Sequence, residues 1–327
     1  MGIKYLNRYL RDNCTESIKC INVADLSGKR IAVDISIYLY KYEADDCLLE
    51  NIYLMLSIFR KYNVIPIFIF DGKPPPEKKA LLQKRREDKE EAQQEYNNLK
   101  SQLNNISSTE DKQDILNQMD MLKSKIVQMS KTKIENVKQL IRAYGATYYD
   151  APGEADELCA LLVLKKKVWA CLSEDMDLFV YGCPRVLRYF SLMNHTMVLY
   201  FMKGILDELQ MTHKEFKDIC ILSGTDYNIN ANTSNVNDEE VNLFKTLKYF
   251  NKYKTNTNNT NKSFYNWLLE NSEYITDNDL LNKIHLMFDV EEGKTKLDIF
   301  KEIRIANGPI RNDEIQDIMR NEGFLFI

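Results

Sequence analysis

The sequence is poor in the residues that mark several common classes of protein. Its 327 residues include only three histidines, and its seven cysteines are irregularly spaced with no Cys-x-x-Cys pair. A zinc site or a disulfide framework is therefore not expected. Unpaired cysteines of this kind are typical of a reducing, intracellular compartment. Any catalytic chemistry must depend mainly on carboxylates, lysines and hydroxyl groups.

Long apolar runs are also missing. No 18 consecutive residues are apolar, so no transmembrane helix is predicted. The first ten residues lack the apolar core of a signal peptide. We therefore expect a chain that does not associate with membranes.

Neither sign of charge dominates the composition. Acidic residues number 48 and basic residues 44, which gives a net charge of −4. This balance excludes a uniformly basic nucleic-acid coat but permits a local basic patch on an acidic body. Hydrophobic residues make up 44% of the chain, a value typical of a folded globular protein of one large domain or two smaller ones.

Two near-continuous apolar runs predict buried strands at 30–34 and 64–71, with an amphipathic helix between them at 47–62. Such runs are typical of strands covered on both faces, and the order strand, helix, strand begins a parallel α/β sheet. Further strands are predicted at 147–150, 168–172, 186–189 and 197–201. Further helices are predicted at 134–140, 151–164, 213–221, 264–269, 280–288 and 313–321.

Two segments differ from this pattern. The segment from 73 to about 135 is polar and charged, and it predicts two long helices with a break near 104–109. It is either a solvated helical hairpin or a functional arm. The segment 228–261 contains 11 asparagines and is predicted to be mainly loop. We therefore divide the chain into a core of residues 1–227, with subregions 1–72, 73–135 and 136–227, and a helical C-terminal region of residues 228–327.

Acidic residues gather at the ends of predicted elements. One such residue would be explained as a turn or helix cap. Several at the carboxyl ends of parallel strands would share one crevice, where they cannot all remain ionised without cations. Hard divalent cations such as Mg²⁺ suit these ligands, and two ions about 3.5–4 Å apart can stabilise both oxygens of a phosphodiester under attack. The acids are Asp34, Asp71, Glu154, Asp156, Asp175, Asp177 and Asp226.

A basic cluster follows the second strand. Lys78 and Arg85 are seven residues apart, so on a helix they share one face and could grip a phosphate together. The alternative is a solvated helix face paired with the acids that follow it. The whole cluster consists of Lys73, Lys78, Lys79, Lys84, Arg85 and Arg86.

Six short motifs carry a family resemblance. They are Met1-Gly2-Ile3 with Leu6, Ala32-Val33-Asp34, Phe70-Asp71-Gly72-Lys73-Pro74-Pro75, Asp150-Ala151-Pro152-Gly153-Glu154-Ala155-Asp156, Ser173-Glu174-Asp175-Met176-Asp177 and Leu222-Ser223-Gly224-Thr225-Asp226-Tyr227. In this order they resemble the flap endonuclease and XPG-type family of structure-specific 5′-nucleases. Each motif alone is weak, but six in register over residues 1–227 are specific.

The resemblance implies a metal-dependent phosphodiesterase of DNA replication or repair, which cuts 5′-single-stranded branches where they join duplex DNA. It implies a PIN-like α/β core, with a mostly parallel central sheet flanked by helices and residues 73–135 as a helical arch. Two Mg²⁺ ions are expected as cofactors, with Mn²⁺ able to substitute, and flapped or branched DNA as the partner. We expect a monomer, in the nucleus or, for a viral protein, at a cytoplasmic replication site.

The resemblance also implies residue roles. The seven acids match the family's metal cluster, and Lys78 and Arg85 match its two catalytic cations at the foot of the arch. Tyr40 matches an aromatic that stacks on a base, and Gly2 matches an N-terminal residue close to the active site. Further DNA contacts are expected at Lys73, Lys79 and Arg86.

The chain departs from the family pattern in three places. Asp156 stands where most flap-cutting members have glutamate and the exonuclease branch has aspartate. Residues 228–237 lack the glycines of the helix–two-turn–helix that binds duplex DNA and often potassium, so a degenerate form is expected. Gln316 and Met319 begin a sliding-clamp motif whose aromatic positions are not aromatic here, so no clamp motif is predicted.

Other functions remain open beside the flap endonuclease. A 5′–3′ exonuclease on nicked or recessed duplex DNA is supported by Asp156. A catalytically inactive scaffold would typically have lost several of the acids, and all seven are present. An RNA nuclease with a PIN-like fold would not need the insertion at 73–135.

Overall fold

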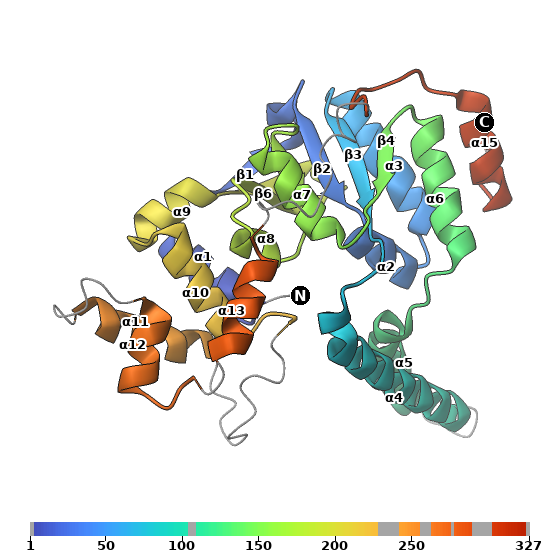
Figure 1. Ribbon diagram of the computed structural model, residues 1–327. Helices are drawn as coiled ribbons and strands as arrows, with labels where there is room; N and C mark the ends of the chain where they lie inside the picture. The colour runs from blue at the N-terminus through green and yellow to red at the C-terminus, as the bar shows by residue number, and fades with distance from the viewer. Residues whose placement is uncertain are drawn as a thin grey trace.

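A seven-stranded sheet forms the centre of the molecule (Figure 1), in the order β1-β7-β6-β5-β2-β3-β4. The strands are β1 (Ile18–Asn22), β2 (Arg30–Asp34), β3 (Ile65–Phe70), β4 (Thr147–Asp150), β5 (Ala170–Leu172), β6 (Arg185–Ser191) and β7 (Thr196–Phe201). This computed structural model describes residues 3–103, 109–227, 242–255, 263–275, 278–289 and 303–324.

Five neighbouring strands of the sheet are parallel. β2 pairs with β3 on one side and with β5 on the other, so that Ala32 lies opposite Ile67 and Cys171. β4 and β6 extend this parallel block, whereas β7 and β1 add to it in antiparallel fashion. The predicted α/β class with a mostly parallel sheet is confirmed. The carboxyl ends of the parallel strands therefore meet at one edge.

Alternate residues of each central strand enter two different cores. Ala32 packs with one cluster of buried side chains, whereas Ile31 and Val33 pack with the other. This double burial explains why the strands are continuous apolar runs in the sequence. The first core contains α1 (Leu6–Asn13), α7 (Ala155–Leu164), α8 (Asp177–Val180), α9 (Met202–Leu209), α10 (His213–Ser223), α11 (Asn242–Thr255), α12 (Phe264–Asn271) and α13 (Asn278–Met287). The second contains α2 (Ser36–Ala44), α3 (Leu48–Lys61), α6 (Lys131–Ala143) and α15 (Asn312–Asn321).

Two long helices project from the edge where the parallel strands end (Figure 1). They are α4 (Lys79–Leu103) and α5 (Thr109–Ile126), which pack along each other. A short 3₁₀ turn, η2 (Pro76–Lys78), joins β3 to α4. The two predicted helices are confirmed, and residues 104–108 at their predicted break lie outside the described residues.

The prediction of loop across 228–261 is wrong for its middle part. Residues Asn242–Thr255 form α11, which buries Leu243, Leu247 and Phe250 against the first core. Apolar side chains at this spacing share one helix face, and their burial outweighs the weak helix propensity of asparagine. The expected degenerate helix–two-turn–helix at 228–237 lies outside the described residues.

The C-terminal segment returns to the sheet. Gly308 N donates to Gly145 O at 2.7 Å, and α15 then packs on α6 through Ile315 and Met319. Within the described residues, no helix combines the length and the apolar character needed to cross a membrane.

Candidate active site

Three neighbouring strands deliver carboxylates to one edge of the sheet. Asp34 is the last residue of β2, Asp71 follows β3 directly, and Asp175 follows β5 after a short turn. Because β2 lies between β3 and β5, these ends are side by side. The structure thus places the predicted acids of the strand ends together.

Gly72 brings the end of β3 against the start of α7. A Cβ at this position would lie 1.9 Å from Ala151 O, so the close approach requires glycine. Gly72 N donates to Gly153 O at 2.7 Å, and Asp71 Oδ1 accepts from Ala155 N at 2.8 Å. Asp71 therefore joins the strand edge to the N-terminus of α7, which carries Glu154 and Asp156.

Two serines orient the acids, and the sequence analysis missed both. Ser173 Oγ donates to Asp34 Oδ2 at 2.8 Å and accepts from Asp175 N at 3.1 Å. Ser36 Oγ donates to Asp71 Oδ2 at 2.5 Å. A hydroxyl residue one or two positions beyond each strand is the signal that could have indicated them.

Asp177 is the most deeply buried acid of the group. It is 1% exposed, and neither carboxylate oxygen accepts a hydrogen bond from any described residue. Burial raises the pKa of Asp177 well above its usual value, and Asp175 and Asp226 raise it further, while Lys78 acts in the opposite direction. A buried carboxylate without a donor is costly, so its presence here indicates a role beyond folding.

Burial and neighbouring carboxylates also raise the pKa of two other acids. Burial raises the pKa of Asp34 to about 7, with Asp71 and Asp175 adding to the shift. Burial likewise raises the pKa of Asp156 well above its usual value, and Asp175 and Glu154 raise it further. The cluster as a whole therefore holds more negative charge than its surroundings neutralise.

Lys78 is the main internal counter-ion of the cluster. Its Nζ lies 2.6 Å from Glu154 Oε1 and 3.5 Å from Asp226 Oδ2. Burial lowers the pKa of Lys78, but the carboxylates of Asp156, Glu154 and Asp226 more than offset this, so the pKa stands above its usual value. Lys78 is therefore a fixed positive charge.

Arg85 reaches the same acid from the exposed side. Its Nη2 lies 3.1 Å from Asp226 Oδ2, and its side chain is 44% exposed. The structure thus brings Lys78 and Arg85 to the same acid, but not from one helix as predicted, because Lys78 belongs to η2 and only Arg85 to α4.

Tyr227 supports the acidic cluster from the turn that follows α10, a role that the sequence analysis did not assign. Its hydroxyl donates to Glu154 Oε2, and Lys78 Nζ lies 4.9 Å from its ring centroid. Glu154 is therefore held by a cation on one oxygen and by a phenol on the other.

A cavity of about 870 Å³ opens between α2 and the paired helices α4 and α5. Tyr40 is 53% exposed and lines it, together with Asp71, Arg85 and Arg86. Lys73 and Lys79 are exposed and do not line this cavity. Gly2, predicted to lie near the active site, is outside the described residues.

The donor set fits a hard divalent cation. Within the described residues, no three acidic, histidine or cysteine side chains are disposed to enclose a single ion as they stand. Lys78 instead occupies the space between Glu154 and Asp226. The two unpartnered oxygens of Asp177 and the surrounding excess of carboxylates are nevertheless the ligands that Mg²⁺ prefers.

Arg188 anchors the turn that carries Asp175 and Asp177. It is buried, and its Nη2 donates to Glu174 O at 2.9 Å while its Nη1 donates to Asn7 Oδ1 at 2.8 Å. The sequence analysis did not find this contact, because it joins α1, β6 and the turn after β5 across long stretches of chain.

Comparisons with known proteins agree with this architecture. The family model for the XPG N-terminal domain matches residues 1–92, and the model for the XPG I-region matches residues 145–226. Together these two models match more than half of the chain. They include all seven acids, Lys78 and Arg85.

Individual proteins give the same result. A protein named flap endonuclease 1 from Lodderomyces elongisporus is 31% identical over 248 residues, which cover 69% of this chain and 61% of that protein. The chain thus spans about three-fifths of the length of this curated relative. The catalytic core of Rad2 in complex with DNA substrate matches with a TM-score of 0.64 and 20% identity, covering 99% of this chain and 95% of that one.

A third similar structure is the Holliday junction-resolving enzyme GEN1 in complex with product DNA and Mg²⁺. It matches with a TM-score of 0.61 and 17% identity, and the alignment covers 98% of this chain and 73% of that one. At this identity the likeness shows a shared fold. From the matched family models and the 31% identical relative, the chain belongs to the XPG and flap endonuclease family of structure-specific nucleases.

Proposed function

We propose that this chain is a Mg²⁺-dependent 5′-flap endonuclease, which hydrolyses a DNA phosphodiester at the junction between single strand and duplex. The observation that carries the proposal is Asp177, a buried carboxylate with no hydrogen-bond donor among the described residues, whose pKa is raised further by Asp175 and Asp226. Such a group is stabilised when a cation binds it.

The seven acids would hold two Mg²⁺ ions, and Mn²⁺ has the same preference for oxygen ligands. When bound, such a pair supplies an activated water and stabilises the attacking and leaving oxygens of the phosphodiester. The serines that hold Asp34 and Asp71 fix two of the carboxylates in advance. This preparation lowers the cost of ordering the ligands when the cations bind.

Lys78 and Arg85 supply positive charge beside the same acids. A phosphate that enters this edge of the sheet would meet the guanidinium of Arg85 first, since Arg85 is the more exposed of the two cations. A fixed cation next to the reacting phosphate stabilises the charge that develops during hydrolysis. We assign these two residues a catalytic role on that basis.

The cavity between α2 and the paired helices α4 and α5 would hold the single-stranded branch. Tyr40 offers an exposed ring for stacking on an unpaired base, a contact that does not depend on sequence. Arg86 lines the same cavity and would contact the phosphate backbone, with Lys73 and Lys79 at the foot of α4. The DNA substrate in the Rad2 complex and the product DNA and Mg²⁺ with GEN1 support this assignment.

The test is cleavage of an end-labelled duplex with a 5′-flap, with a nicked duplex lacking the flap alongside. Wild type, Asp177→Ala and the surface control Asp12→Ala are compared with and without Mg²⁺. We expect a single junction product that requires Mg²⁺, persists in Asp12→Ala and is absent in Asp177→Ala. Retained cleavage by Asp177→Ala would contradict the metal assignment.

A 5′–3′ exonuclease is the second candidate, and Asp156 favours it. Its short side chain is buried, and its Oδ1 accepts from Glu157 N at 2.7 Å on its own helix. Stepwise release of nucleotides from the nicked duplex would favour this function. If neither substrate is cut, both nuclease proposals fail.

A further inference from the structure

The edge of the sheet opposite the acidic cluster carries a row of basic residues. The row follows the amino ends of four neighbouring strands, in the order β6, β5, β2 and β3. All of its members are exposed except Arg185, which is partly buried. We call this row the basic edge, and its members are Lys29, Arg30, Lys61, Lys165, Lys166, Lys167 and Arg185.

These charges are not neutralised by neighbouring acids. The segments 27–30, 60–65, 164–170 and 182–185, which lead into the four strands, contain no aspartate or glutamate. Asp25 precedes the first of them, and its Oδ2 accepts from Asn22 N at 2.9 Å.

The ion pairs of the described residues lie elsewhere. None of the seven side chains of the basic edge forms one with a described residue, whereas Lys138 pairs with Asp150 and Arg142 pairs with Glu135. The chain has a net charge of −4, so the basic edge is a strong local departure from the overall charge.

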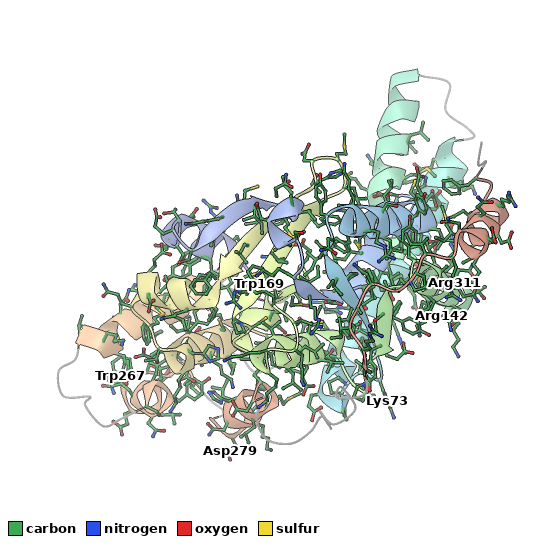
Figure 2. The ribbon with its side chains drawn as sticks, turned by 90° about the horizontal axis from the view of Figure 1, so that it is seen from above. Lys73, Arg142, Trp169, Trp267, Asp279 and Arg311 are labelled. Atoms are coloured by element: carbon green, nitrogen blue, oxygen red, sulfur yellow. The ribbon has the colours of Figure 1, made fainter. Side chains whose placement is uncertain are left out.

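Trp169 orders two cations of the basic edge. Lys29 Nζ lies 5.9 Å from the centroid of its ring and Arg185 Cζ lies 5.0 Å from it. Arg185 Nη1 also donates to Trp169 O at 3.3 Å. Trp169 is only partly buried, and Figure 2 places it near the middle of the molecule as seen from above. The tryptophan thus fixes cations at the surface.

Local helix structure explains only part of the row. The turn Lys165–Lys167 follows the C-terminus of α7, where a cation is favoured by the helix dipole. Lys166 has a φ of 57°, a left-handed conformation that usually favours glycine or asparagine at a helix end. The dipole of α7 does not account for the cations that precede β2, β3 and β6.

The spacing of the basic edge suits a polyanion. Neighbouring strands lie about 4.8 Å apart, so four of them span about 15 Å. Duplex DNA carries one negative charge per about 1.7 Å of its axis, and several phosphates of one duplex can therefore face the row. Contacts of this kind are made to the backbone and carry no sequence information.

We propose that the basic edge is a second nucleic-acid contact, which binds the phosphate backbone of a duplex segment other than the one being cut. The two edges are separated by the length of β2, which is five residues, or about 15 Å. The segment bound here is therefore distinct from the phosphodiester that faces the acids. This inference rests on the proposed function only in taking DNA as the substrate.

The first test is the salt dependence of duplex binding in EDTA, where no cleavage occurs. Fluorescence anisotropy of a labelled linear duplex of about 20 base pairs gives the dissociation constant between about 50 and 200 mM KCl. The triple variant Lys165→Gln/Lys166→Gln/Lys167→Gln should lower the slope of log affinity against log salt by about 2–3, since each lost phosphate contact removes about 0.9.

A matched control has the same change in net charge. Lys19→Gln/Lys203→Gln/Lys214→Gln alters three exposed lysines on β1, α9 and α10 and should keep the wild-type slope. Equal slopes in both triple variants would overturn the proposal. If the first variant fails to fold, Lys29→Gln/Lys61→Gln provides the same comparison on neighbouring turns, with Lys203→Gln/Lys214→Gln as its control of equal charge.

A second measurement locates the contact. Acetylation of lysines, read by mass spectrometry with and without the duplex, should show protection at Lys165–Lys167 and none at Lys203. If the duplex protects Lys165–Lys167 from acetylation no more than it protects Lys203, the proposal is contradicted. An acidic protein would then be the alternative partner. The chain could bind duplex through the basic edge and yet cut no flap. That result would contradict the proposed nuclease function but not the duplex contact.

Discussion

The side chain of Arg188 contacts Glu174 twice, once at its main-chain oxygen and once at its carboxylate. Arg188 Nη2 donates to Glu174 O at 2.9 Å, and Arg188 Nε lies 3.4 Å from Glu174 Oε2. The residue after Glu174 is Asp175, so this pair fixes the turn that presents two of the candidate metal ligands.

Replacing Arg188 should therefore destabilise the fold and impair the site. Arg188→Met removes one partner of a buried ion pair, and we expect the free energy of unfolding to fall by about 3 kcal/mol. Urea denaturation measures this loss. The exposed control Arg8→Met, which removes a helix surface pair with Asp12, should change stability by less than about 0.5 kcal/mol. A similar loss in both variants would contradict the anchoring role.

Asp177→Asn should stabilise the metal-free protein while it abolishes cleavage. The substitution removes a buried charge that has no donor among the described residues. We expect a gain of about 1–3 kcal/mol in the free energy of unfolding in EDTA. The surface control Asp12→Asn should leave it unchanged. A destabilised Asp177→Asn would mean that this carboxylate is satisfied in the folded protein.

Lys78→Met and Arg85→Met should differ in stability but not in their effect on cleavage. Both remove a cation beside Asp226, so both should slow flap cleavage strongly. Lys78 is buried between two carboxylates, and its loss should cost about 3 kcal/mol, whereas the more exposed Arg85 should cost at most about 1 kcal/mol. Added Mg²⁺ should restore part of the stability of Lys78→Met, which thermal unfolding can measure.

Gly72→Ala should be severe and Gly153→Ala mild, although both glycines lie in the same junction. A Cβ at Gly72 would meet Ala151 O at 1.9 Å, whereas a Cβ at Gly153 has only Glu157 Oε2 at 4.0 Å. We expect Gly72→Ala to lower the free energy of unfolding by about 1–3 kcal/mol through forced backbone shifts. Equal stability of the two variants would show that the junction can relax.

His213 should make the protein less stable in mild acid. Burial lowers the pKa of His213, and the nearby Lys217 and His285 act in the same direction, against the main-chain oxygen of Phe179. Below about pH 6.5 the unfolded chain takes up a proton that the folded chain refuses, so stability falls as the pH falls. The effect is at most about 1.4 kcal/mol per pH unit. His213→Gln should flatten the stability profile between about pH 7 and 5; an unchanged profile would contradict this.

The sheet could be predicted from the sequence because its strands are buried on both faces. The runs at 30–34 and 64–71 are apolar at almost every position, and the structure has β2 at Arg30–Asp34 and β3 at Ile65–Phe70. The acids at the strand ends were found for the same reason. In a parallel sheet, sequence position alone decides which edge they share.

The contacts that tune the site could not be predicted in this way. Ser36 reaches Asp71 across 35 residues, and Tyr227 reaches Glu154 across 73. Neither residue has a local pattern that specifies its partner. The asparagine-rich segment misled for the opposite reason. Its composition suggested a loop. The structure instead has the helix α11, because the spacing of Leu243, Leu247 and Phe250 lets one helix face bury all three side chains.

Lys78 belongs to two structures at once, since it ends the turn at the root of α4 and lies between Glu154 and Asp226. A displacement of the N-terminal end of α4 would therefore change the charge balance among the acids. Thermodynamic reciprocity requires the converse: a cation that competes with Lys78 for these acids, or a phosphate that competes with the acids for Lys78, alters the preferred position of α4. The position of α4 and the occupancy of the acidic cluster are thus linked in a single equilibrium.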